Sequence, residues 1–197
     1  MDGTYEGLEK SSEIRESELF QGFLVYTIAV TLNTVGLVSA ILYRASEFFD
    51  PWIIPLIYLM IQGVDAAVAL AAGYSYDRYG VKFLSVPFVL SVIPSILTVT
   101  AKTSLVILVA AAVFGLVLGM QESIYRAAVA DLVPLSSRGK AYGLFNTFYG
   151  IGFLVGGVVF GFFLDRKGMA LAAIIYTLVT QFFALVLLSS VRRKISA

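Results

Sequence analysis

The chain has 197 residues, of which 59% are hydrophobic and 14% charged, and its mean hydropathy is +0.89. A soluble domain of this length needs more polar surface, so the composition favours a membrane protein. Cysteine and histidine are absent, which excludes disulfides, histidine-centred metal sites and Ser-His or Cys-His catalysis, and we expect no metal or cofactor. A net charge of +1 with dispersed basic residues gives no indication of nucleic-acid binding.

Long apolar runs predict six membrane-spanning helices, because about twenty helical residues cross a hydrocarbon layer of ~30 Å. The expected spans are residues 19–43, 51–76, 83–101, 104–130, 140–164 and 169–191. These runs lack the alternation of a β-barrel wall, so helices are expected. Residues 1–18 are polar and acidic and predict a cytoplasmic linker or tail, and residues 192–197 predict a basic cytoplasmic tail.

The distribution of Lys and Arg predicts the orientation in the membrane. With both termini on one side, that side receives nine basic residues: Lys10, Arg15, Arg78, Lys82, Arg138, Lys140, Arg192, Arg193 and Lys194. The other side receives four: Arg44, Lys102, Arg166 and Lys167. Since cytoplasmic loops carry an excess of positive charge, both termini are expected in the cytoplasm, with the chain in the plasma membrane.

A short motif occurs twice, as GYSYDRYG at residues 73–80 and GFFLDRKG at residues 161–168. Both fit G-x-x-x-D-R-x-G, and each ends the middle helix of a predicted three-helix unit. Three helices per unit invert the second unit, so the two copies should lie on opposite membrane faces. We favour such an inverted repeat, which is common in secondary transporters. The alternative is that glycines and charges commonly mark a helix leaving the lipid.

Three stretches resemble the C-terminal six-helix half of the major facilitator superfamily. They are GYSYDRYGVK at residues 73–82, ADLVPLSSRGKAYGLFN at 130–146 and the glycine-rich GIGFLVGGVVFGFFLDRKG at 150–168. The resemblance implies an all-α membrane fold in which six transmembrane helices form a 3+3 inverted repeat. Family members usually carry twelve helices, so it also implies a second six-helix half, or a second copy of this chain, as partner within the bilayer.

The resemblance further implies a gate at the cytoplasmic ends of the helices, where opposite charges pair. Its residues would be Gly73, Asp77, Arg78, Gly80, Lys82, Asp131 and Arg138. The outer copy of the motif consists of Gly161, Asp165, Arg166 and Gly168. Alternatively, the basic residues of these loops only set the topology.

Several polar residues lie within the apolar spans, where a lone charge costs at least ~2.5 kcal/mol. Asp65, with Gln62 one turn before it, is expected either to bind a proton or cation or to form a structural hydrogen bond between helices. Glu122 and Arg126 are spaced to pair on one helix, in a stripe with Gly115 and Gly119. That pair is structural, belongs to the inner gate, or contacts an anionic or zwitterionic substrate.

Asn33 and Asn146 complete the candidate substrate and ion pathway. By resemblance, the first, second, fourth and fifth helices line the cavity, whereas the third and sixth face lipid. The polarity of the spans agrees, since the sixth helix carries only Gln181 as an amide. Pro55, Pro87 and Pro94 are expected to bend their helices.

We therefore expect a secondary active transporter, or the C-terminal half of one, that moves a small solute by alternating access, with proton coupling as one option. The alternative is a truncated six-helix protein that transports nothing without a partner half or a homodimer. No nucleotide-binding loop of the G-x-x-x-x-G-K-[ST] type occurs, which argues against ATP-driven pumping. The sequence has no G-x-S-x-G and no histidine, so an enzyme is not expected.

Overall fold

The structure is a computed structural model that describes residues 19–34, 37–166 and 168–195, with side chains described as far as Val191. The expected linker at residues 1–18, Lys167 and the side chains of the expected basic tail lie outside the described residues. Within the described ranges all regular secondary structure is helical, which confirms the predicted all-α class.

The first helix covers residues 19–33 and is followed by α2 (Leu37–Ala45). The remaining elements are η1 (Pro51–Ile53), α3 (Ile54–Tyr79), η2 (Gly80–Leu84), α4 (Ser85–Leu90), α5 (Val92–Thr100), α6 (Ser104–Leu132), η3 (Leu135–Ser137), α7 (Arg138–Asp165) and α8 (Ala170–Ile195).

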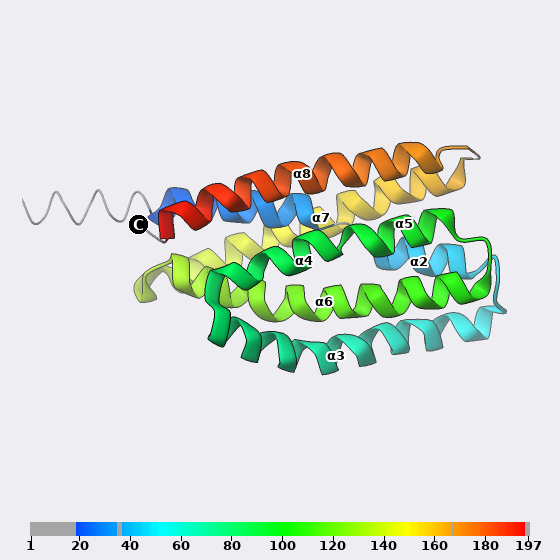
Figure 1. The fold of residues 1–197 in the computed structure, drawn as a ribbon, viewed down its shortest axis with the longest axis horizontal. Coiled ribbons are helices and arrows are strands. Elements are labelled where there is room, and N and C mark those ends of the chain that lie inside the picture. The colour runs from blue at the N-terminus through cyan, green and yellow to red at the C-terminus, as the bar shows by residue number, and fades with distance from the viewer. Residues whose placement is uncertain (1–18, 35–36, 167, 196–197) are drawn as a thin grey trace, which may run out of the picture.

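Five helical segments are long and apolar enough to cross a membrane: Leu19–Ala45, Pro51–Thr100, Ser104–Leu132, Leu135–Asp165 and Ala170–Val191. The second has 50 residues, which would extend about 75 Å if it were straight, more than twice the hydrocarbon thickness. Figure 1 shows that it is folded back on itself, because the chain reverses after α3 and returns as α4 and α5.

The helices lie side by side along one long axis, with the connections gathered at the two ends of the bundle (Figure 1). The junction of α3 with α4 lies at one end, and the junction of α7 with α8 lies at the other. Gly80 and Gly168, the last glycines of the two motif copies, have φ angles of 58° and 89°. Only glycine adopts this region readily, so each copy ends its helix with a turn that requires glycine.

The prolines act differently from one another. A single residue, Ser91, separates α4 from α5, because Pro94 has no N–H to donate to the carbonyl of Leu90. The helix, in which a bend was expected at Pro94, is thus interrupted by one residue. Pro55 lies in the first turn of α3, where its missing N–H has no helical partner to lose. The expectation that Pro55 bends α3 is wrong, since this proline begins the helix.

Among the elements from α2 to α8, the most extensive contact joins α3 and α6, and glycines make it possible. A Cβ atom added at Gly119 would lie 2.5 Å from the Asp65 carbonyl oxygen, and one at Gly115 would lie 2.7 Å from the Ile61 carbonyl oxygen. Both distances are too short for any non-bonded contact. Within the predicted stripe, Gly115 and Gly119 are therefore buried against α3.

A polar core holds four helical segments together around Asn33, which is 0% exposed. Its Nδ2 donates to Ser91 Oγ at 2.9 Å and to Gln181 Oε1 at 2.6 Å. Its Oδ1 accepts from Gln121 Nε2 at 2.9 Å and from the Tyr125 hydroxyl. Every hydrogen-bonding position of the amide is used. Ser91 and Gln181 are buried, so the third and sixth predicted spans do not present these polar groups to lipid.

The close approach of α6 to α3 predicts that Gly119→Ala destabilises the protein. The added methyl group must push the helices apart, and overpacking of this kind typically costs about 1–3 kcal/mol. Gly150→Ala is the matched control, because a Cβ there meets nothing within 4 Å and alanine favours the helix. Thermal unfolding in mild detergent should give a lower midpoint for Gly119→Ala alone. Equal midpoints for both variants would contradict the packing described for Gly119.

The polar core predicts that Asn33→Leu destabilises the protein by at least about 2 kcal/mol, because its buried partners lose their hydrogen bonds. Asn146→Leu makes the same chemical change at an exposed asparagine and should leave stability nearly unchanged. Reversible unfolding in mixed detergent micelles measures both variants. If Asn33→Leu were as stable as Asn146→Leu, the amide network would not hold the bundle together.

Candidate functional site

Asp65 lies at the middle of α3 and is 9% exposed. The contact of Gly119 with the Asp65 backbone brings α6 next to this position, and Glu122 follows one turn later on α6. Asp65 and Glu122 therefore lie on adjacent helices within about one turn of the same contact. Among the described residues, none donates a hydrogen bond to the Asp65 carboxylate. The two predicted acids are thus brought together by glycine packing.

Glu122 and Arg126 pair along α6, as their spacing predicts. The distance from Arg126 Nη1 to Glu122 Oε2 is 4.0 Å, and Nη1 also donates to the Glu122 carbonyl oxygen at 3.1 Å. Their side chains are 44% and 42% exposed, respectively. A charged pair is therefore presented on the outside of this bundle, within a helix long enough to cross a membrane.

Tyr149 on α7 joins this group and was not predicted from the sequence. It is 7% exposed, and its hydroxyl is buried without a hydrogen-bond partner among the described residues. Tyr142, two turns earlier on the same side of α7, donates to the Arg126 carbonyl oxygen at 3.1 Å, so this side of α7 packs against α6. In a helix rich in aromatic residues a single tyrosine carries no distinguishing signal, so only the packing of α7 reveals it. We call Asp65, Glu122, Arg126 and Tyr149 the charged cluster.

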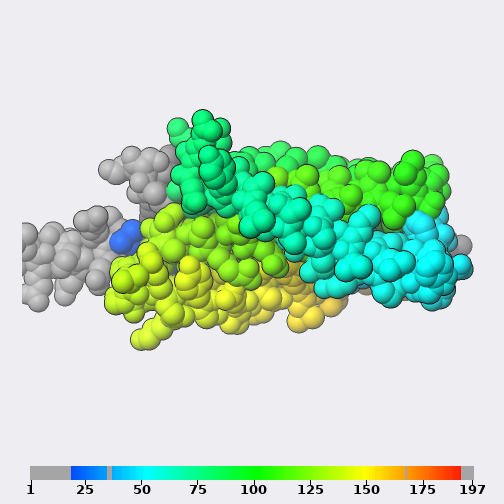
Figure 2. Space-filling model, turned by 90° about the horizontal axis from the view of Figure 1, so that it is seen from below, coloured from blue at the N-terminus to red at the C-terminus, as the bar shows by residue number. Residues whose placement is uncertain are grey.

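The charged cluster joins α3, α6 and α7, and Figure 2 shows a face of the molecule on which these three helices are exposed together. Gln62 is half-buried on α3, and Asn146 is exposed on α7, one turn before Tyr149. Asn33 is not part of this group, because its amide is fully engaged in the polar core. The pathway roles of these residues remain predictions.

The predicted gate residues gather at the end of the bundle where α3 meets α4. Asp77, Arg78, Lys82 and Asp131 are exposed, and Arg138 is partly buried. Among the described residues, ion pairs within 4.0 Å are confined to Arg44 with Glu47 and Glu122 with Arg126. The expected direct pairing of the gate charges is therefore absent from this structure.

Tyr76 explains why these charges do not pair. It is 5% exposed and occupies the inward side of the last turn of α3, which leaves Asp77 and Arg78 pointing outward. Its hydroxyl donates to Asp131 Oδ2 at 2.8 Å, and Arg138 Nη2 donates to the Ala130 carbonyl oxygen at 2.9 Å. A tyrosine and a backbone carbonyl thus take the places that the sequence suggested for charged partners.

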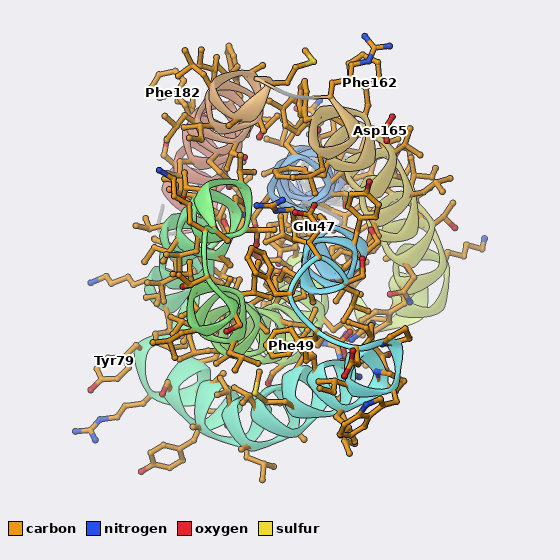
Figure 3. All side chains as sticks on the ribbon, turned by 90° about the vertical axis from the view of Figure 1, so that its right-hand side faces the viewer. Glu47, Phe49, Tyr79, Phe162, Asp165 and Phe182 are labelled. Atoms are coloured by element: carbon orange, nitrogen blue, oxygen red, sulfur yellow. The ribbon has the colours of Figure 1, made fainter. Side chains whose placement is uncertain are left out.

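The second motif copy lies at the opposite end, where Figure 3 shows Asp165 and Glu47 near the viewer and Phe162 pointing outward. The Arg166 guanidinium carbon lies 4.0 Å from the centre of the Phe162 ring, a cation–π contact. The two copies differ at their first glycine. A Cβ at Gly73 would lie 3.2 Å from Ser123 Oγ, whereas one at Gly161 would meet nothing within 4 Å.

Comparison with known proteins gives relatives in bacteria and fungi. Two uncharacterised mycobacterial proteins, Mb2288 of Mycobacterium bovis and Rv2265 of Mycobacterium tuberculosis, are each 33% identical over 174 residues. The match covers 88% of this chain but 41% of each relative. The MFS transporter asaE of Aspergillus flavus is 28% identical over 147 residues, which cover 74% of this chain and 32% of that protein. No solved structure matches the chain.

The chain thus spans about two fifths of the length of its mycobacterial relatives. The model of the Major Facilitator Superfamily matches residues 19–196, which includes every described helix. This is a family of membrane transporters and not of enzymes, in agreement with the sequence prediction. The protein is a member of the major facilitator superfamily.

Proposed function

We propose that this chain forms one six-helix half of a secondary transporter, which moves a small solute by alternating access and couples the movement to protons through Asp65. The observation that carries the proposal is the charged cluster, in which a half-exposed ion pair on α6 lies next to Asp65, a residue of α3 that is 9% exposed. A charge at the middle of a lipid-facing helix costs about 2.5–3.5 kcal/mol. The face that carries this cluster therefore meets water or protein, as a transport pathway does.

Several features support two inverted three-helix units with six crossings. The motif copies end α3 and α7 at opposite ends of the bundle (Figure 1), and both use a glycine with positive φ. Close glycine contacts also join the two units in two places: Gly119 on α6 meets the α3 backbone, and a Cβ at Gly152 on α7 would lie 2.9 Å from the Thr31 carbonyl oxygen of the first helix. Repeats of this kind let one bundle rock against another around a fixed site.

A second six-helix body is proposed to cover the face of α3, α6 and α7 that carries the charged cluster. The chain matches only 41% of the mycobacterial relatives, so the remaining part of such proteins is long enough to supply it. The end of the bundle with Arg78, Lys82, Arg138 and Lys140 is proposed to face the cytoplasm, in keeping with the positive-inside rule. The gate function implied for the Asp77–Arg78 end belongs to the same proposal.

Proton coupling is proposed from the charge balance of the charged cluster. Asp65 and Glu122 supply two negative charges, and Arg126 supplies one positive charge, so full ionisation leaves one negative charge uncompensated within the membrane. A proton neutralises it at the lowest cost. The alternative structural role of Asp65 requires a hydrogen bond to another helix, and no described residue provides one. The charge balance therefore favours the proton site.

Cysteine accessibility tests whether the face of the charged cluster lines a pathway. The chain has no cysteine, so each variant carries one thiol. Glu122→Cys and Asn146→Cys should react in membranes with a charged, membrane-impermeant methanethiosulfonate. Val186→Cys, at an exposed apolar residue a similar distance along α8, should react only with a lipophilic maleimide. If Glu122→Cys reacted only with the lipophilic maleimide, as is expected of Val186→Cys, the face would contact lipid and the proposal would fail.

The coupling role predicts that Asp65→Asn removes solute-driven proton movement. The chain, with any partner that co-purifies, is reconstituted in liposomes that contain a pH-sensitive dye and is given amino acids, sugars, organic anions and organic cations in turn. Solute-dependent proton flux should fall at least tenfold in Asp65→Asn, while solute counterflow persists. Asp50→Asn, at an exposed residue before α3, is the control and should behave as the unchanged chain. Undiminished proton flux in Asp65→Asn would exclude Asp65 from coupling.

A further inference from the structure

The charged cluster contains hydrogen-bonding groups that the described protein leaves unused. The Tyr149 hydroxyl is buried and has no partner, and the Asp65 carboxylate receives no hydrogen bond within the described ranges. The Arg126 guanidinium has five N–H donors. Its Nη1 group is directed at Glu122, one turn earlier on the same helix. Unused donors and unused acceptors thus lie together in one place.

Tyr149 cannot readily turn its hydroxyl elsewhere. Its ring is stacked on Phe145 at a centroid distance of 5.8 Å and meets the edge of Phe153 at 5.0 Å. This aromatic stack fixes the direction of the ring on the side of α7 that packs against α6, where Tyr142 donates to the Arg126 carbonyl oxygen. A buried hydroxyl without a partner typically costs about 1–3 kcal/mol. Such groups are rare in folded proteins and call for a specific explanation.

The two kinds of unused group indicate the charge of the ligand. A simple anion would satisfy Arg126 and Tyr149, but it would also lie against the carboxylates of Asp65 and Glu122. A simple cation would satisfy the carboxylates, but it would face the guanidinium and leave the Tyr149 hydroxyl unpaired. A solute that carries one group of each sign satisfies both sets at once.

We propose that the charged cluster binds a zwitterionic solute, with Arg126 and Tyr149 holding its anionic group and Asp65 and Glu122 holding its cationic group. This assignment deepens the proposed transport function and rests on it. Charge-assisted hydrogen bonds from the guanidinium and the phenol would orient the anionic group. Glu122 would then exchange its distant contact with Arg126 for the cationic group of the solute. The Tyr149 hydroxyl favours a zwitterion over a simple cation, because a simple cation would leave this hydroxyl unpaired.

Binding of matched solutes tests the ligand class. The purified chain, with any partner that co-purifies, is placed in lipid nanodiscs and titrated with alanine, β-alanine, γ-aminobutyrate and glycine betaine. Propylamine, choline and propionate serve as probes that carry a single charge. At least one zwitterion should raise the unfolding temperature in a saturable manner, and the singly charged probes should not. Stabilisation by a singly charged probe alone, or by none of the solutes, would overturn the assignment.

Tyr149→Phe tests the residue that carries the argument. Because the hydroxyl has no partner in the protein, its removal should leave the unfolding temperature without solute unchanged or slightly higher. The same variant should weaken binding of the stabilising zwitterion about tenfold, the effect of one lost hydrogen bond to a charged group. Tyr58→Phe, at an exposed tyrosine of α3, is the control and should bind normally. Undiminished zwitterion binding by Tyr149→Phe would remove Tyr149 from the site.

The cysteine labelling described for Glu122 separates the two possible failures. If Glu122→Cys reacts with the impermeant reagent but no zwitterion binds, the pathway stands and the ligand class is wrong. If Glu122→Cys reacts only with the lipophilic reagent, the face contacts lipid and both proposals fail.

Discussion

The contact between Gly119 and the backbone of Asp65 determines how closely α6 approaches α3. Neither helix could take this position with a larger residue at Gly119. Because the helices approach closely at Gly119, Glu122 lies about one turn from the level of Asp65, and Arg126 follows on the next turn. The charged cluster is thus a consequence of helix packing, which connects two glycines in an apolar run to the polar chemistry beside them.

Two polar systems within the bundle differ in how fully they are satisfied. Around Asn33, donors and acceptors match and the group is buried, so this network stabilises one arrangement of the helices. In the charged cluster, Asp65 and Tyr149 lack partners within the described ranges, and Glu122 and Arg126 are half exposed. The Asn33 network therefore stabilises a rigid arrangement of the helices. The charged cluster leaves groups available for the proposed solute, for a proton or for a second helical bundle.

The sequence was sufficient for the features that depend on local chemistry. Apolar runs predicted an all-α membrane protein, spacing predicted the pairing of Glu122 with Arg126, and Pro94 predicted an irregularity, expected as a bend, in its helix. Features that depend on helix rotation were not predictable. The direction of Gly115 and Gly119 toward α3, the burial of Gln181 beside Asn33, and the role of Tyr149 follow from which side of each helix meets a neighbour. The composition of a helix does not specify which of its sides faces a neighbouring helix. A single tyrosine among phenylalanines does not by itself indicate a functional role.

The central claim is that the face of α3, α6 and α7 that carries the charged cluster meets water and a second protein body. Electron cryomicroscopy of the chain in lipid nanodiscs, with the partner that co-purifies, tests it most directly. The account predicts a second helical bundle against α3 and α7, with a hydrated gap at Glu122 and Arg126. Ordered lipid acyl chains in contact with Glu122 and Arg126 would contradict it.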